Sequence, residues 1–136
     1  MMMKVAIIGS RSYTNSRKVK DFIHQLKEKF NDELEIVSGG QKEGSDGYAK
    51  KFALELDVNY SEFPPQHYSH NMHCIRPKYD YGKKYYVSNY FKRNKQIAEY
   101  SDRIVAFVSN PNDITSGTLS TLQYAEKMNK KSIIID

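Results

Sequence analysis

Val5-Ala6-Ile7-Ile8-Gly9-Ser10-Arg11 is a short apolar run that stops at a glycine and a polar turn. Three more runs of strand length, rich in β-branched residues, recur along the chain, and a weaker one lies between them. The three cover residues 34–37, 104–108 and 133–135, and the weaker run covers 58–63. The sequence therefore predicts five β-strands.

Segments with helical periodicity separate these runs. Apolar residues recur at spacings of three and four over residues 19–30, 48–56, 88–100 and 119–128. Asn15 or Ser16 suits the start of the first helix as a cap, and the Asp46 carboxylate suits the start of the second. The alternation predicts an α/β, Rossmann-like doubly wound fold: a mostly parallel five-stranded sheet with right-handed crossovers and helices on both faces.

The length of 136 residues predicts a single domain over 1–136. No apolar run approaches the roughly 18 residues that a membrane span needs, so we expect no membrane partner. The apolar run near the start, residues 5–8, is too short for the apolar region of a secretory signal. The single cysteine, Cys74, has no second cysteine with which to form an internal disulfide. These features predict a cytoplasmic protein.

The net charge of +5 is concentrated in one segment. Residues 67–95 contain seven Lys or Arg against one acid, Asp80, which gives +6 there and −1 elsewhere. Residues 66–89, which overlap this segment, lack any sustained period and form a predicted basic, Tyr-rich insert. Aromatic residues between cations favour a ligand lid or a subunit contact, and they also suit single-stranded nucleic acid. The tyrosines are Tyr68, Tyr79, Tyr81, Tyr85, Tyr86 and Tyr90.

The same insert contains three histidines and the cysteine, at spacings that would hold zinc on a helix. They are His67, His70, His73 and Cys74. No carboxylate or second cysteine completes a ligand set, and Cys74 would face away from His73 on a helix. We therefore predict no metal and no cofactor.

Ligands of open parallel sheets bind beyond the carboxyl ends of the strands. Three turns there carry glycines, hydroxyls or a charged group, and the helix starts that follow add backbone N–H donors. The turns contain Gly9, Ser10 and Arg11; then Gly39, Gly40 and Asp46; and last Ser116, Gly117 and Thr118. Each turn alone is equally typical of a tight connection or a helix cap. Together they predict a phosphate-binding site, although neither GxGxxG nor a Walker A loop is present.

With Arg93-Asn94 eight residues ahead of Ser101-Asp102, these motifs resemble the SLOG superfamily, with the YspA-like branch closest. That superfamily includes the Lonely Guy (LOG) phosphoribohydrolases, the DprA proteins and the YspA/YpsA-related proteins. The resemblance covers nearly all of the chain except the insert, and it implies a nucleotide-derived ligand at the strand ends. It further implies that Arg93 holds phosphate and sugar, that Gly117 and Thr118 form the phosphate-binding turn, and that the protein is a homo-oligomer.

The chain departs from the LOG enzymes where their catalysis takes place. Thr121 stands where they carry a glutamate, and Ile114-Thr115-Ser116 replaces their paired glycines. The turn after the second strand has one more residue before Gly44 than we expect of relatives. A threonine cannot do acid-base work on a glycosidic bond, so no catalytic residue is predicted and the question of enzymatic activity stays open.

The leading hypothesis is a module that binds a nucleoside phosphate, an ADP-ribose-like molecule or a cyclic nucleotide signal, as a sensor or a sponge, for instance in phage defence. One alternative is a LOG-like nucleoside monophosphate phosphoribohydrolase, in which Asp46, Asp113 or Glu126 would replace the missing glutamate. The other is a DprA-like binder of single-stranded nucleic acid that uses the basic insert.

Overall fold

The computed structural model describes residues 2–10, 12–39, 44–63 and 87–136, with only the backbone for 87–91. Five strands form one sheet in the order β3-β2-β1-β4-β5, and every neighbouring pair is parallel. The strands are β1 (Met3–Gly9), β2 (Leu34–Ser38), β3 (Asn59–Glu62), β4 (Arg103–Phe107) and β5 (Lys131–Ile135). The predicted doubly wound parallel sheet is confirmed.

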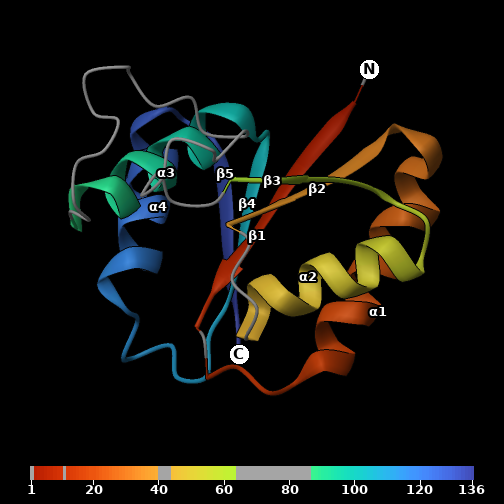
Figure 1. Cartoon of the computed structure of the whole chain (residues 1–136), viewed down its shortest axis with the longest axis horizontal. Helices are drawn as coiled ribbons and strands as arrows, with labels where there is room; N and C mark the ends of the chain where they lie inside the picture. The colour runs from red at the N-terminus through yellow and green to blue at the C-terminus, as the bar shows by residue number, and fades with distance from the viewer. Residues whose placement is uncertain (1, 11, 40–43, 64–86) are drawn as a thin grey trace, which may run out of the picture.

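Helices cover both faces of the sheet, as the sequence predicts (Figure 1). The pair α1 (Ser16–Phe30) and α2 (Gly44–Glu55) lies on one face, with the short 3-10 turn η1 (Asn31–Glu33) after α1. The pair α3 (Val87–Tyr100) and α4 (Ser116–Lys127) packs on the other face. Described parts of the chain contain no helix that is both long and apolar enough to cross a bilayer.

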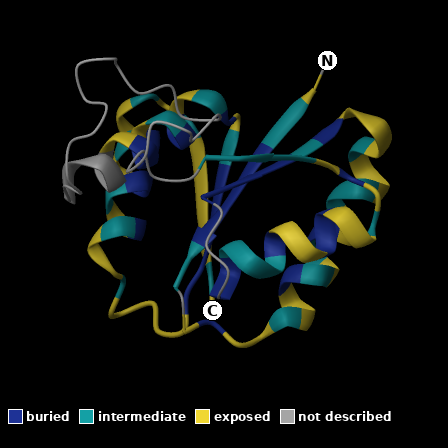
Figure 2. Ribbon diagram, viewed as in Figure 1, coloured by how far each residue is buried: buried dark blue, intermediate teal, exposed yellow. Residues whose placement is uncertain are grey.

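The central strand β1 is buried on both faces (Figure 2). Val5 and Ile7 pack with α1 and α2, whereas Ala6 and Ile8 belong to the second core cluster, on the face that α3 and α4 cover. A strand covered on both faces must be apolar at every position, and this explains the unbroken run that opens the chain.

The topology contains a switch point between β1 and β4. From β1 the chain leads through α1 to β2 on one side, and β4 adds to the other side of β1 after α3. Connections diverge at such a point, and open α/β sheets bind their ligands there, at the carboxyl ends of the strands.

Local boundaries follow the capping residues. The Asn15 side chain accepts a hydrogen bond of 3.2 Å from the Lys18 N–H at the start of α1. Thr115 caps α4. Several boundaries differ slightly from the prediction. For example, α2 begins at Gly44, before Asp46, and β5 begins at Lys131 because pairing with Arg103 extends it.

Candidate functional site

The turn after β1 is built on a glycine that no other residue can replace without strain. Gly9 has φ +145°, and a Cβ there would lie 1.9 Å from the Phe107 carbonyl oxygen. The Ser10 N–H donates to that same oxygen over 3.2 Å, and Ser45 Oγ, at the start of α2, donates to it over 3.1 Å. The ends of β1 and β4 and the start of α2 are therefore fixed together at the switch point.

Serine hydroxyls gather beside this junction. Ser10 Oγ lies 2.6 Å from Ser12 Oγ, which lies 3.4 Å from Ser109 Oγ beyond β4. Hydroxyls both donate and accept hydrogen bonds, so this group suits a polar ligand. Of the predicted residues in this turn, the structure describes Gly9 and Ser10 at this junction, and Arg11 lies outside the described residues.

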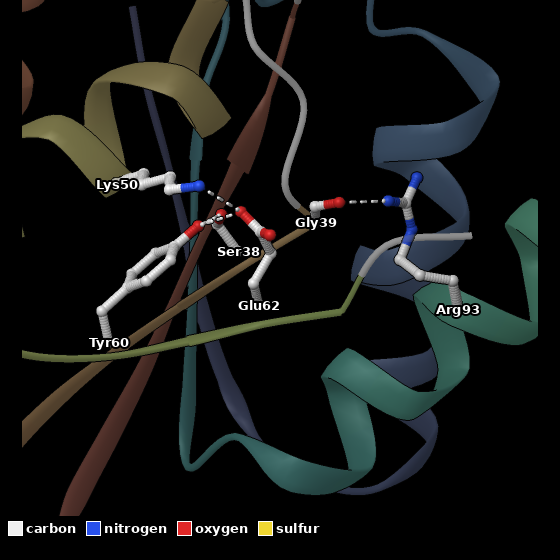
Figure 3. Close-up of polar contacts among 6 residues, drawn as sticks. All are labelled: Ser38, Gly39, Lys50, Tyr60, Glu62 and Arg93. Carbon is white, nitrogen blue, oxygen red and sulfur yellow. Dashed lines mark hydrogen bonds and ion pairs between the residues drawn. The ribbon is translucent and has the colours of Figure 1, made fainter. Parts of the chain in front are cut away.

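Gly39 follows β2 and is enclosed by two side chains of opposite charge. A Cβ at Gly39 would lie 2.4 Å from Arg93 Nη1 and 2.9 Å from Asp46 Oδ2. Arg93 is only 8% exposed and donates from Nη1 to the Gly39 carbonyl over 3.0 Å (Figure 3). A glycine is needed here because two charged side chains approach the backbone so closely. Gly40 lies outside the described residues.

Arg93 and Asn94 connect this turn to the first turn of α4. Arg93 Nε donates to Asn94 Oδ1 over 3.0 Å, and Asn94 Nδ2 donates to the Gly117 carbonyl over 3.2 Å. Asn94 is 4% exposed. The two residues therefore link the end of β2 to the start of α4 across the carboxyl ends of the central strands.

The first turn of α4 is open on its outer side. A Cβ added to Gly117 would meet no heavy atom within 4 Å. Ser116 is exposed, whereas Thr118 is buried at 6% and hydrogen-bonds Thr115 through both its N–H and its hydroxyl. The outward-facing part of this turn is thus Ser116 and the Gly117 backbone, with the buried Thr118 behind it.

Two residues of the motifs that resemble the SLOG superfamily, Thr121 and Asp102, make contacts that stabilise the fold. Thr121, at the position of the LOG glutamate, is 2% exposed and donates to the Gly117 carbonyl over 3.2 Å. Asp102 accepts a hydrogen bond of 2.9 Å from the Lys4 N–H. This contact lies at the amino-terminal ends of β1 and β4, at the opposite end of the strands from the turns. Ser101-Asp102 therefore fixes β4 against β1.

A polar cluster that sequence reasoning missed lies beside Gly39 (Figure 3). Tyr60 donates to Glu62 Oε1 over 3.1 Å and lies 2.6 Å from Ser38 Oγ, and Lys50 Nζ is 3.5 Å from Glu62 Oε1. Burial, followed by the nearby Glu62 and Asp46 charges, raises the pKa of Tyr60. The available signals were the polar last residues of two neighbouring strands and the i, i+4 spacing of Asp46 and Lys50.

The described residues contain no group of three or more His, Cys, Asp or Glu that would hold a metal ion. The predicted insert falls largely at residues 64–86, so its histidines, its cysteine and most of its tyrosines lie outside the described residues.

The fold and these turns define a Rossmann-like protein whose polar residues gather at the carboxyl ends of its strands. The chain belongs to the circularly permutated YpsA SLOG family, whose model matches residues 36–136. The predicted SLOG resemblance is thereby confirmed. Among curated proteins, the sequence comparison finds no match.

Three solved structures share the fold. DNA processing protein A from Helicobacter pylori, studied for its single-stranded DNA binding, has a TM-score of 0.71 at 22% identity over 97% of this chain. This chain spans 64% of that protein. The molybdenum cofactor binding protein of Rippkaea orientalis gives 0.68 at 18% identity, over 98% of this chain and 76% of its own. The molybdenum cofactor carrier protein of Chlamydomonas reinhardtii gives 0.65 at 16%, with the same two coverages.

Proposed function

We propose that the chain binds a nucleotide-derived small molecule at the carboxyl ends of its strands, with the phosphate beside Gly39 and the first turn of α4. The observation that carries this proposal is the link from Gly39 through Arg93 and Asn94 to Gly117. It places a buried guanidinium between a glycine turn and a helix start, and both kinds of structure bind phosphate.

The magnitudes show what else such a ligand needs. A charged hydrogen bond contributes about 1.5 to 3 kcal/mol, a neutral one about 1, and a helix terminus about 0.3 to 1. Together these polar contacts contribute roughly 5 to 7 kcal/mol of binding free energy, whereas micromolar binding requires about 8 kcal/mol. A stacked base would add about 1 to 3 kcal/mol, so the ligand carries a base or another flat ring.

A biological setting can be proposed that requires binding alone. A small module that captures an ADP-ribose-like molecule or a cyclic nucleotide acts as a sensor or a sponge, and phage defence is one setting for either. We extend the proposal to a homo-oligomer, as the SLOG resemblance implies, and to a cytoplasmic location, which the sequence predicts. Sedimentation with and without ligand tests the assembly.

Single-stranded nucleic acid is the second candidate. The +6 charge of residues 67–95 favours it, and DNA processing protein A shares the fold. Neutralised phosphates make such binding fall steeply with salt. Retention of a single-stranded oligonucleotide that disappears between about 50 and 200 mM salt would support this candidate over a small molecule.

A LOG-like phosphoribohydrolase is the third candidate, and the geometry weakens it. Thr121 is occupied by its bond to the Gly117 carbonyl, and of the proposed substitutes only Asp46 lies beside Gly39 and Arg93. Asp113 is an exposed loop residue, and Glu126 lies near the carboxyl end of α4. Incubation with AMP and chromatography for free adenine tests this candidate, since absence of base release removes it.

Titration calorimetry with AMP, ADP, ADP-ribose and cyclic AMP tests the leading proposal. At least one ligand should bind the wild type, and Arg93→Gln should weaken it tenfold or more. The matched control is Arg17→Gln, which removes an exposed arginine on α1 and should leave affinity unchanged. Absence of binding by every ligand would overturn the proposal.

A further inference from the structure

The carboxylate of Glu62 is oriented more firmly than a surface ion pair requires. Ser38, which is 0% exposed, lies beside it (Figure 3), and the Tyr60 ring packs against the core cluster on the face that α1 and α2 cover. Tyr60 has one hydroxyl proton and donates it to Glu62, so Ser38 must donate to Tyr60. The direction of the whole chain of hydrogen bonds is therefore fixed, and it ends on Glu62 Oε1.

The ion pair with Lys50 does not explain this arrangement. Lys50 is about half exposed, with 52% of its side chain accessible, and its Nζ is 3.5 Å from Glu62 Oε1. Glu62 is more covered, with 23% of its side chain accessible, but solvent screens a pair with one half-exposed partner, so this pair contributes about 0 to 1 kcal/mol. Both contacts fall on Oε1, and within the described ranges no hydrogen bond reaches Oε2.

Glu62 belongs to the same site as Gly39 because the two strand ends are tied together. Glu62 pairs in register with Ser38, the residue before Gly39, and the Phe63 N–H donates to the Ser38 carbonyl over 2.9 Å. Arg93 Nη1 reaches the carbonyls of both following residues, Gly39 at 3.0 Å and Phe63 at 3.5 Å. Glu62 thus directly precedes Phe63, and its register partner Ser38 directly precedes Gly39. Phe63 and Gly39 supply the two carbonyls that Arg93 reaches.

The site is consequently polarised. The Arg93 guanidinium and the start of α4 favour an anion on one side of Gly39. Asp46 Oδ2 lies on this same side of Gly39, close to Arg93. Toward β3, Glu62 pairs with Lys50 through Oε1 alone, and a carboxylate only accepts hydrogen bonds. A matching ligand carries phosphate at one end and hydroxyl donors near it, as a ribose does.

We propose that Glu62 binds the ribose hydroxyls of the ligand and makes the site selective for ribonucleotides over deoxyribonucleotides. The inference rests on the proposed function and names the substrate class for that same site. Tyr60 is a positioning residue, because its hydroxyl holds the carboxylate without reaching the ligand. A hydrogen bond from a hydroxyl to a carboxylate corresponds to roughly a ten- to hundredfold preference.

The test compares AMP, ADP and ADP-ribose with their 2′-deoxy and 3′-deoxy counterparts by calorimetry. Wild type should prefer the ribose form over at least one deoxy form by roughly ten- to a hundredfold. Glu62→Gln should abolish that preference while deoxy forms bind as before. Tyr60→Phe, which keeps the packed ring, should lower the preference in part.

The matched control is Glu35→Gln. Glu35 is also a β2–β3 sheet carboxylate that accepts a bond from a tyrosine, Tyr100, but it lies at the amino-terminal end of β2. The Glu35→Gln substitution should leave the preference for the ribose form intact. Urea unfolding should show that Glu62→Gln, Tyr60→Phe and Glu35→Gln are all folded. Equal binding of ribose and deoxy forms by wild type would overturn this inference alone. If no nucleotide binds wild type, the proposed function fails and the inference falls with it.

Discussion

Arg93 and Gly39 are joined by a hydrogen bond of 3.0 Å from the guanidinium Nη1 to the backbone carbonyl, and the arginine is 8% exposed. A buried guanidinium needs acceptors for its donors, and the Gly39 and Phe63 carbonyls supply two of them. Arg93 therefore braces the turn after β2 and also brings positive charge to the strand ends.

Gly39→Ala tests this closeness directly. The new methyl carbon would lie 2.4 Å from Arg93 Nη1 and 2.9 Å from Asp46 Oδ2, so both side chains must move. We expect a loss of about 1.5 to 3 kcal/mol in the free energy of unfolding, the value of one charged hydrogen bond. Ligand affinity should fall at least tenfold. A variant with wild-type stability and affinity in urea unfolding and calorimetry would contradict the geometry.

Gly117→Ala separates binding from stability. Its methyl meets nothing within 4 Å, and alanine in a helix is favoured over glycine by about 0.4 to 1 kcal/mol. The urea midpoint should therefore stay level or rise. If a phosphate approaches this backbone, the methyl occupies its space and affinity should drop about tenfold, or 1.4 kcal/mol. Unchanged affinity would place the ligand elsewhere.

Gly9→Ala should be among the most damaging single changes at the strand ends. The position has φ +145°, and the added carbon would lie 1.9 Å from the Phe107 backbone oxygen, which cannot easily move. Strain of this kind amounts to about 1 to 3 kcal/mol before the clash is added. Ser45→Ala should lose only about 1 kcal/mol, the value of its bond to the same oxygen. Because the obstacle is backbone, adding Ser45→Ala should not rescue Gly9→Ala, and a rescue in thermal unfolding would refute this explanation.

Stability should fall at alkaline pH partly through Tyr60. Burial is the first cause that raises the pKa of Tyr60 in the folded chain. Above about pH 10 the unfolded chain releases this proton while the folded chain keeps it, so the free energy of unfolding decreases with rising pH. Below that range the contribution is fully present. Each such proton gives a slope of about 1.4 kcal/mol per pH unit.

Tyr60→Phe isolates this contribution. The variant should be less stable than wild type at neutral pH, because a hydrogen-bonded hydroxyl is lost, yet its stability should decline less steeply above pH 10. Urea unfolding at intervals from pH 8 to 11 measures both slopes. Parallel slopes would show that Tyr60 has the same pKa in the folded and unfolded chains.

The layers of the fold were predictable because periodicity reports burial. β1 is apolar at consecutive positions since helices cover both of its faces, and α1 shows one apolar stripe because it has one buried face. Helix and strand limits were less predictable. β5 starts at Lys131, and pairing with β4 decides that start, since local composition does not mark it.

Residues of the candidate site stand out in the sequence only where one short segment carries the signal. Gly9, Gly39 and Gly117 stand out as glycines at strand ends or helix starts, and the structure gives each a distinct close approach or open space. The Ser38, Tyr60, Glu62 and Lys50 cluster instead depends on the register of β2 against β3 and on the placement of α2. Register and helix placement arise from tertiary packing, which one sequence does not reveal.

An NMR titration of the labelled protein with the tightest nucleotide tests the central claim most directly. The account predicts that the amide signals of Gly39, Ser116 and Gly117 shift together with one dissociation constant, and that Arg93→Gln abolishes these shifts. Shifts centred on Lys4 and Asp102, at the amino-terminal ends of the strands, with the Gly39 and Gly117 signals unchanged, would contradict it.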